Sequence, residues 1–257
     1  MIIDVSGLVA EARPIAERAA AVYVRHTGDD FVGLLAHGSA VKGGVIPGCS
    51  DIDLQLYLRD AAFSAGEPLP LEQQMAIHRD LSLIDTGPFA YIQCYAFGSC
   101  FPDGWTGPVP GAYRIIAGRL PLPEATEEML RRSASARLRT MDPWPSYLKD
   151  NLIEHGRGRL ARHLRLLCTD VWPTLYQLLI VGGADAIPTW NLPKQEAMER
   201  IPADTAAGAA IRGFYRAVRA YFPDETSVAD ALDAVAHGLA FLAAAKAEAA
   251  TAQEGHA

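Results

Sequence analysis

The sequence is poor in cysteine. Its 257 residues contain four, Cys49, Cys94, Cys100 and Cys168, and no two of them have Cys-x-x-Cys spacing. Such a low density argues against a disulfide-stapled secreted scaffold, and the spacing does not match a structural zinc site. We therefore expect reduced, partly buried thiols in a cytoplasmic protein.

Two further features are missing. The sequence has no uninterrupted apolar run of the roughly 20 residues that a membrane-spanning helix needs, and its first residues show no basic segment followed by an apolar core. Basic residues are not in excess either, because the formal net charge is −7. We therefore expect no membrane span and no general binding to nucleic acid, which favours a basic face. An acidic cleft would instead attract a cationic small substrate.

The first part of the chain mixes helical and strand patterns. Residues 51–58 alternate polar and apolar with period two, which predicts a strand with one polar face. Residues 31–36 form a short apolar run between glycines, which is typical of a buried strand. A Gly-rich turn (38–50) joins these two. The other predicted elements are helices over 8–25 and 71–83 and strands over 89–97 and 113–117.

The character of the sequence changes near residue 120. A Pro- and Gly-rich stretch precedes this point, and almost everything after it has helical periodicity. We therefore predict an α+β fold with two domains, a small mixed-sheet domain over 1–120 and a helical domain over 121–257. The expected helices of the second domain cover residues 124–139, 160–181, 194–200, 206–221 and 227–249.

Chemistry-bearing residues gather around the Gly-rich turn. Asp51 and Asp53 are two apart on a predicted strand, so both carboxylates point to the same face. Magnesium is commonly held by one or two carboxylates together with substrate phosphates. Gly38 and Ser39 follow the preceding strand directly, where backbone N–H groups and a hydroxyl can meet phosphate oxygens. Either pair alone would mean little, but the order strand, Gly-Ser, turn and Asp-x-Asp strand is specific.

This pattern resembles the DNA polymerase β-like nucleotidyltransferase superfamily. The fuller string, Gly38-Ser39-Ala40-Val41, Gly43-Gly44, Pro47 and Ser50-Asp51-Ile52-Asp53-Leu54, is most similar to aminoglycoside adenylyltransferases acting on streptomycin and spectinomycin. The resemblance implies a nucleotidyltransferase domain with a small mixed sheet, followed by a helical C-terminal domain. It also implies Mg²⁺ on Asp51 and Asp53, and ATP or another nucleoside triphosphate held near Gly38, Ser39 and Ser50.

A second match lies downstream, in the segment Leu192-Pro193-Lys194 and the residues that follow it. It is similar to the Pro-Lys segment in the helical domain of these adenylyltransferases, which implies that Lys194 contacts the triphosphate. An ammonium there would offset charge on the transferring phosphates. The alternative is a solvated lysine at a helix start.

The sequence departs from the family at the third carboxylate. The family supplies this acid from a later strand, where it serves as metal ligand or general base. The strand predicted over 89–97 presents Gln93 toward the site instead. An amide can orient a hydroxyl or coordinate a metal weakly, but it cannot accept the proton.

The leading hypothesis is an enzyme that moves AMP from ATP to a hydroxyl of a small, possibly aminoglycoside-like acceptor, with Asp51, Asp53 and Gln93 at the reacting centre. One alternative is a nucleotide-binding regulatory or sensor protein with the same fold and little transferase activity, which Gln93 favours. Another is a nucleotidyltransferase that modifies a protein or RNA partner. The negative charge argues against the RNA form of that alternative.

Overall fold

The computed structural model describes residues 1–63, 69–101, 104–156 and 158–254. Within this part of the chain the residues group into two compact units, Met1–Ala125 and Thr126–Ala257. The composition of the sequence predicts a boundary at residue 120, inside the connection that leads to the second unit.

The first unit is built on a four-stranded sheet with the strand order β3-β2-β1-β4. Strand β1 pairs antiparallel with both β2 and β4, whereas β2 and β3 run parallel, so the sheet is mixed as predicted. The strands are β1 (Phe31–His37), β2 (Ile52–Leu58), β3 (Ile92–Phe97) and β4 (Tyr113–Gly118).

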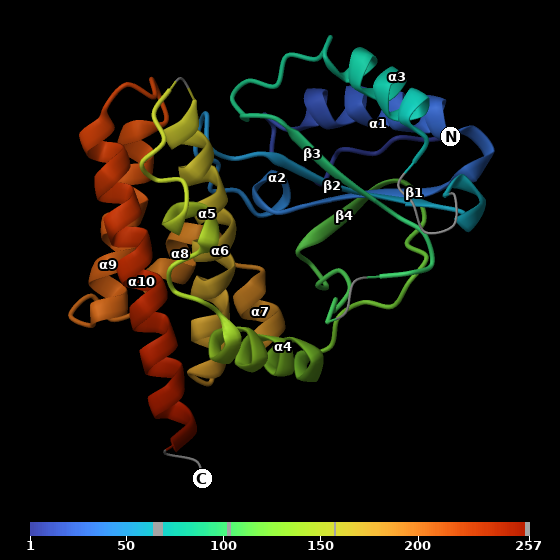
Figure 1. The fold of residues 1–257 in the computed structure, drawn as a ribbon. Coiled ribbons are helices and arrows are strands. Elements are labelled where there is room, and N and C mark those ends of the chain that lie inside the picture. Colours follow the sequence, from blue (N-terminus) through green and yellow to red (C-terminus); the bar gives the residue numbers. More distant parts are fainter. Residues whose placement is uncertain (64–68, 102–103, 157, 255–257) are drawn as a thin grey trace. The chain divides into compact units, whose positions relative to one another are not determined.

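One face of this sheet is apolar and is covered by helices α1 (Arg13–Thr27) and α3 (Leu71–Leu81) (Figure 1). The residues of β2 that point to these helices, Ile52, Leu54 and Leu56, are at most 1% exposed. They join side chains of α1 and β1 in one hydrophobic core. Because β-strand side chains alternate, the intervening residues of β2 lie on the opposite face.

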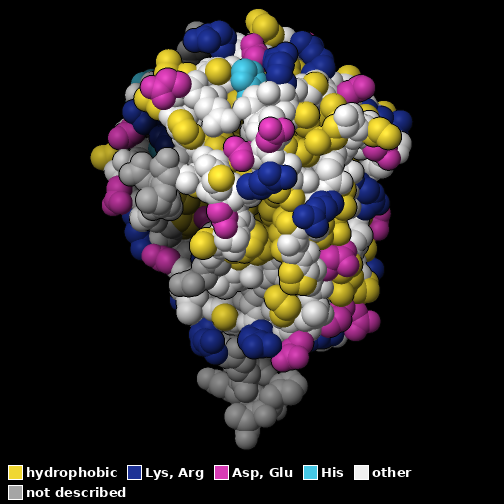
Figure 2. All heavy atoms as spheres, turned by 90° about the vertical axis from the view of Figure 1, so that its right-hand side faces the viewer, with side chains coloured by type: hydrophobic (Ala, Val, Ile, Leu, Met, Phe, Trp, Pro, Cys, Tyr) yellow, Lys and Arg dark blue, Asp and Glu magenta, His cyan; other side chains and the backbone are white. Residues whose placement is uncertain are grey.

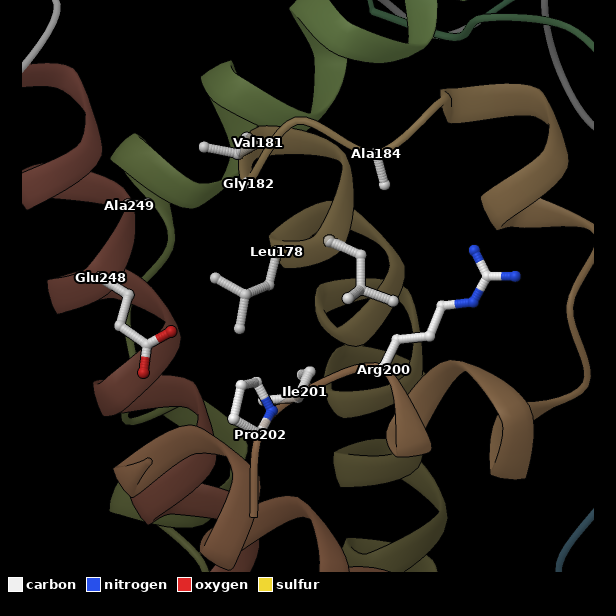
Figure 3. Close-up of a pocket in the computed structure, with 10 residues that line it drawn as sticks. Leu178, Val181, Gly182, Ala184, Arg200, Ile201, Pro202, Glu248 and Ala249 are labelled. Carbon is white, nitrogen blue, oxygen red and sulfur yellow. The ribbon is translucent and has the colours of Figure 1, made fainter. Parts of the chain in front are cut away.

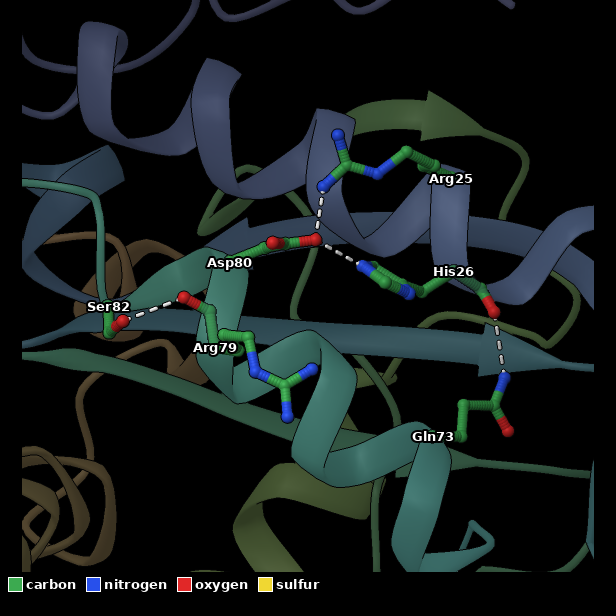
Figure 4. A network of polar contacts seen from close by, with 6 residues as sticks. All are labelled: Arg25, His26, Gln73, Arg79, Asp80 and Ser82. Atoms are coloured by element: carbon green, nitrogen blue, oxygen red, sulfur yellow. Dashed lines mark hydrogen bonds and ion pairs between the residues drawn. The ribbon is translucent and has the colours of Figure 1, made fainter.

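Polar contacts also connect the two covering helices (Figure 4). The Asp80 carboxylate of α3 accepts hydrogen bonds from the side chains of Arg25 and His26 near the end of α1, each at 2.5 Å. The hydrogen bond from His26, together with Arg25, keeps the pKa of the Asp80 carboxyl below its usual value. Gln73 adds a bond to the His26 carbonyl at 2.8 Å. These contacts fix α3 on α1 above the apolar face.

Short helices complete the first unit. Helix α2 (Ser39–Lys42) lies inside the segment predicted as a Gly-rich turn, and two 3₁₀ turns, η1 (Gly28–Asp30) and η2 (Asp60–Ala62), flank strands. Pro14 lies in the first turn of α1, where a proline's missing N–H costs nothing.

The second unit is helical. Three of its helices begin at a hydroxyl cap: Thr126 accepts from the Met129 N–H, Thr205 from Gly208 and Ser227 from Asp230, at 3.0–3.2 Å. Its elements are α4 (Glu127–Thr140), α5 (Ser146–Lys149), α6 (Arg159–Val181), α7 (Ala186–Trp190), α8 (Lys194–Glu199), α9 (Ala206–Tyr221) and α10 (Val228–Glu254).

Helix α10 is apolar enough over Val228–Thr251 to cross a membrane by length and composition, although the sequence has no uninterrupted apolar run. A core helix of a water-soluble unit passes the same test. Here Phe241, Leu242 and Ala245 are at most 1% exposed, and α10 packs on α6 and α9. The Lys246 ammonium donates to the Met141 carbonyl at 2.8 Å. Burial of one side of α10 within the unit accounts for its composition.

Candidate functional site

The register of the sheet brings three site residues into one row. Asp53 of β2 is paired with His37 of β1 on one side and with Gln93 of β3 on the other. Directly opposed residues of neighbouring strands point to the same face of a sheet. The row therefore lies on the face opposite α1 and α3, and Gln93 occupies the position beside Asp53 that the sequence predicts for it.

The Gln93 side chain joins the two carboxylates. With its nitrogen toward them, the amide donates to Asp53 Oδ1 at 2.9 Å and to Asp51 Oδ2 at 3.2 Å. In the same orientation its oxygen accepts from the Tyr95 hydroxyl at 2.9 Å. Asp51 precedes the first residue of β2, yet both carboxylates lie within reach of one amide group. They therefore converge on one small volume.

Gly38 lies directly against Asp53, one member of this carboxylate pair. A Cβ built on Gly38 would lie 2.2 Å from Asp53 Oδ2, and the backbone has φ +67°, a conformation that disfavours any side chain. Gly38 is also the residue that precedes α2. Both the close approach of Asp53 and the positive φ therefore require a glycine here. Because Gly38 has no side chain, the Asp53 carboxylate can lie against the backbone at the start of the turn.

The two serines of the motif are buried and hold the turn together. Ser50 is 5% exposed, and its hydroxyl accepts from the Ile46 backbone N–H at 2.9 Å. Ser39 is equally buried, and its hydroxyl donates weakly to the Asp51 carbonyl at 3.5 Å. In this structure both hydroxyls face the chain's own backbone. Contact of either hydroxyl with a nucleotide stays a prediction.

His37 extends the row toward β4. Its Nε2 lies 3.3 Å from the Gln55 amide nitrogen, and the Gln55 oxygen accepts from the Tyr57 hydroxyl at 2.7 Å. Burial, helped by the positive charge of Lys42, lowers the pKa of His37 to about 4. The imidazole is therefore neutral near pH 7, and its Nε2 is placed to accept the Gln55 N–H. It is too weak a base to be an effective proton acceptor at that pH.

Sequence reasoning missed two tyrosines on either side of Gln93. Burial, together with the charge of the nearby Asp51 carboxylate, raises the pKa of Tyr91. Tyr95 is 55% exposed and touches the Gln93 amide. The signal was present, because residues 91, 93 and 95 alternate on one predicted strand. The Tyr95 hydroxyl is thus part of the carboxylate site through its bond to Gln93.

An aromatic cluster continues from Tyr95 along the same sheet face. Tyr95 contacts Phe97 with ring centroids 6.4 Å apart, and Phe97 contacts Tyr57, Phe101 and Trp105. The Phe101 and Trp105 rings are stacked, with centroids 4.5 Å apart and planes 7° from parallel. Aromatic faces of this kind can stack on a flat ring or attract a cation.

The two carboxylates suit a cation whose remaining ligands come from the substrate and from water. Among the residues that the structure describes, no group of three or more His, Cys, Asp or Glu side chains is placed to hold a metal. Two converging carboxylates are nevertheless sufficient for Mg²⁺ when substrate phosphates and water supply the remaining oxygens. When its nitrogen faces the carboxylates, the Gln93 amide donates to both of them, so it competes with such a cation for the same oxygens.

Lys194 belongs to the helical unit. It is the first residue of α8, as its helical pattern predicts, and its Nζ lies 5.6 Å from the centroid of the Trp172 ring of α6. The same unit contains a cavity of about 480 Å³ between the ends of α6 and α8 and the last turns of α10 (Figure 3). Apolar side chains line most of it, with Arg200 and Glu248 at its rim, and none of the sequence-predicted site residues takes part.

Charges are mixed on the face of the molecule that Figure 2 presents. Figure 2 shows Lys and Arg side chains interspersed with Asp and Glu on the face it presents, without a continuous basic area. A nucleic-acid-binding face would instead show a basic stripe or patch.

Comparison with known proteins adds a likeness to solved structures. No family model matches the chain, and no curated protein matches it in sequence. Among solved structures, it is similar to spectinomycin adenyltransferase AAD(9) from Enterococcus faecialis, solved with ATP and spectinomycin. The TM-score is 0.54 and the identity 14%, over 92% of this chain and 98% of that one. The chain therefore has an α+β, nucleotidyltransferase-like fold.

Proposed function

We propose that the protein is a magnesium-dependent nucleotidyltransferase that moves AMP from ATP to a hydroxyl of a small molecule. The observation that carries the proposal is the convergence of Gly38, Asp51 and Asp53 at one end of a nucleotidyltransferase-like sheet. The order of these residues in the sequence matches the family motif. In space the two carboxylates converge, and the Gly38 backbone lies against Asp53. That agreement supports a triphosphate and cation site more strongly than either the fold or the motif would alone.

Asp51 and Asp53 would hold Mg²⁺, which would polarise the phosphate oxygens and offset charge during the displacement. The backbone that follows Gly38 would accept the outer phosphates, because no side chain stands between it and Asp53. Lys194 is proposed to offset triphosphate charge from the helical unit. The acceptor hydroxyl would attack the α-phosphorus and lose its proton to solvent water. The bond between the α-phosphorus and the oxygen that bridges to the β-phosphate would break, and pyrophosphate would leave.

The proton of the acceptor hydroxyl has no strong base within the described row. Gln93 cannot accept it, and His37 has a pKa of about 4. General-base assistance is worth roughly 10²–10⁴ in rate, so transfer at this site should be slow compared with a site that has a third carboxylate.

An amine-bearing ring compound is the acceptor class we propose. The aspartates attract cations, and the exposed Tyr95 ring with its aromatic neighbours offers a surface for a ring. Spectinomycin, present in the similar structure, is one such compound and belongs in the first panel.

The test is transfer of label from ATP to a panel of hydroxylated acceptors that includes spectinomycin and aminoglycosides, with magnesium. Wild-type protein should label at least one acceptor, Asp51→Asn should not, and exposed Asp29→Asn should behave as wild type. If no acceptor is labelled and Gln93→Glu does not create activity, the transferase proposal fails.

The second candidate function is nucleotide sensing. It is favoured by one observation, the neutral Gln93 amide in the position of the family's third carboxylate. Magnesium-dependent ATP binding that Asp51→Asn abolishes, without transfer to any acceptor in wild type or Gln93→Glu, would identify a sensor.

A further inference from the structure

Gln93 and Tyr95 form a pair whose hydrogen bond allows two arrangements. A side-chain amide can be turned by half a revolution, which exchanges its oxygen and nitrogen. With the nitrogen toward the carboxylates, the Gln93 oxygen accepts from the Tyr95 hydroxyl at 2.9 Å. With the nitrogen turned toward Tyr95, the same hydroxyl can accept from it instead. A phenol hydroxyl can donate or accept, so Tyr95 is a partner in both orientations.

The two orientations present opposite groups to Asp51 and Asp53. The inward nitrogen donates to both carboxylates, at 3.2 and 2.9 Å, and so offsets their mutual repulsion in the absence of a cation. The inward oxygen would repel the carboxylates but would suit a divalent cation, which accepts carboxylate and amide oxygens alike. The state of the amide is therefore tied to whether a cation is bound.

We propose that Gln93 reverses its amide when a cation binds and that Tyr95 is the positioning residue that holds it in either orientation. The inference rests on the proposed function, because it takes the carboxylate pair to be a cation site. It assigns Gln93 a use that a third carboxylate could not have, since a carboxylate has no donor to bridge Asp51 and Asp53 in the empty site. No proton or covalent bond changes place in this step.

Tyr91 lies on the other side of Gln93 in the sequence. The charge of Asp51 helps to raise the pKa of Tyr91, but the Gln93 amide has the Tyr95 hydroxyl as its partner, not that of Tyr91. Tyr91→Phe is consequently a matched control for Tyr95→Phe: each removes one phenol hydroxyl from the same strand face, but only the second removes the amide's partner.

The experiment follows the Gln93 side-chain NH₂ group by NMR in the full-length protein. Gln93→Leu identifies its signals by their loss. Nuclear Overhauser contacts between this NH₂ group and the Tyr95 ring protons are measured without and with Mg²⁺ and a non-hydrolysable ATP analogue. We expect the contacts to be weak without cation and to strengthen at least about twofold when it binds. In Tyr95→Phe the contacts should no longer strengthen when the cation binds, and the Gln93 NH₂ protons should exchange faster with water. Tyr91→Phe should respond as wild type.

Binding of the cation is measured separately, by titration with Mn²⁺ in the presence of the analogue. If the cation binds and the Gln93 contacts stay unchanged, the amide reversal is wrong while the proposed function stands. A response of Tyr95→Phe equal to that of wild type would also overturn the role of Tyr95. If no cation binds in any variant that keeps both aspartates, the proposed function fails, and the reversal fails with it.

Discussion

The two faces of the four-stranded sheet use alternate residues of the same strand for different purposes. On one face, Leu54 is fully buried under α1 and α3. On the other, its neighbour Asp53 lies between His37 and Gln93 and meets the amide of the latter. Adjacent residues of β2 therefore have different roles: one contributes to the hydrophobic core and the next to the candidate site. Substitutions on the two faces should therefore give different phenotypes.

The largest effect is expected on the polar face. Asp53→Asn keeps the size of the side chain but removes half of the carboxylate pair, so transfer should fall by about 10³-fold or more, as when a key charge-stabilising group is lost. The urea midpoint should change little, because no core packing is lost. Steady-state transfer rates and urea unfolding measured on the same preparation check both halves of this prediction.

The apolar face should show the reverse. Leu54→Ala leaves a cavity beneath the helices and should lower the free energy of unfolding by about 2–5 kcal/mol. The folded fraction should retain transfer activity per molecule, within about threefold, because the Asp51 and Asp53 carboxylates are unchanged. Urea unfolding monitored by circular dichroism measures the first quantity. A loss of activity as large as that of Asp53→Asn, in protein that is still folded, would contradict the assignment of Leu54 to the core alone.

Gly38→Ala tests the contact between the turn and Asp53. The new Cβ would lie 2.2 Å from Asp53 Oδ2, so the carboxylate must move and transfer should fall by about 10²-fold or more. Gly28→Ala is the matched control, because Gly28 has a similar backbone conformation (φ 51°, ψ −124°, against 67° and −144°) but nothing within 4 Å of its Cβ. Both variants should lose about 1–3 kcal/mol of stability, but only Gly38→Ala should lose activity. Equal activity losses would mean that backbone strain alone is responsible.

Gln93→Glu adds the third carboxylate within the polar row. It should tighten Mn²⁺ binding by about tenfold, in line with one added charge interaction of about 1.4 kcal/mol, and should raise the transfer rate above about pH 5. Mn²⁺ titration and a pH–rate profile measure the two effects. Gln74→Glu, on exposed α3, adds the same charge on the other side of the sheet and should do neither.

The smallest effect concerns pH. The folded-state pKa of His37 is about 4, below the usual value of about 6.5. As the pH falls below about 6.5, the unfolded chain takes up a proton that the folded protein does not, so this contribution to stability is complete above pH 6.5 and is lost between about 6.5 and 4. His37→Gln should therefore lose less stability than wild type between these pH values in urea unfolding. His78→Gln, on exposed α3, should follow wild type.

Much of this site follows from local sequence patterns. Period-two alternation predicts β2, and the Gly-Ser and Asp-x-Asp pairs flank the turn as expected. Gln93 lies beside Asp53, in the strand predicted over 89–97, because β3 pairs in parallel with β2 in that register. The start of α8 at Lys194 also agrees with the prediction.

The remainder depends on long-range contacts that no local pattern encodes. The bridge from the Gln93 amide to both carboxylates depends on three-dimensional distances, and so does the effect of the Asp51 charge on Tyr91. Helix α2 was missed because four residues between glycines are too few to show a helical period. The cation–π contact between the Lys194 ammonium and the Trp172 ring joins residues of two different helices, which sequence spacing alone cannot predict.

The most direct test of the central claim compares ATP labelled at the α-phosphate with ATP labelled at the γ-phosphate, with magnesium and the acceptor panel. If Asp51 and Asp53 support nucleotidyl transfer, α-label should move to an acceptor while γ-label leaves in pyrophosphate, and Asp53→Asn should abolish both. Transfer of γ-label to an acceptor, or release of label that Asp53→Asn leaves unchanged, would contradict nucleotidyl transfer at Asp51 and Asp53.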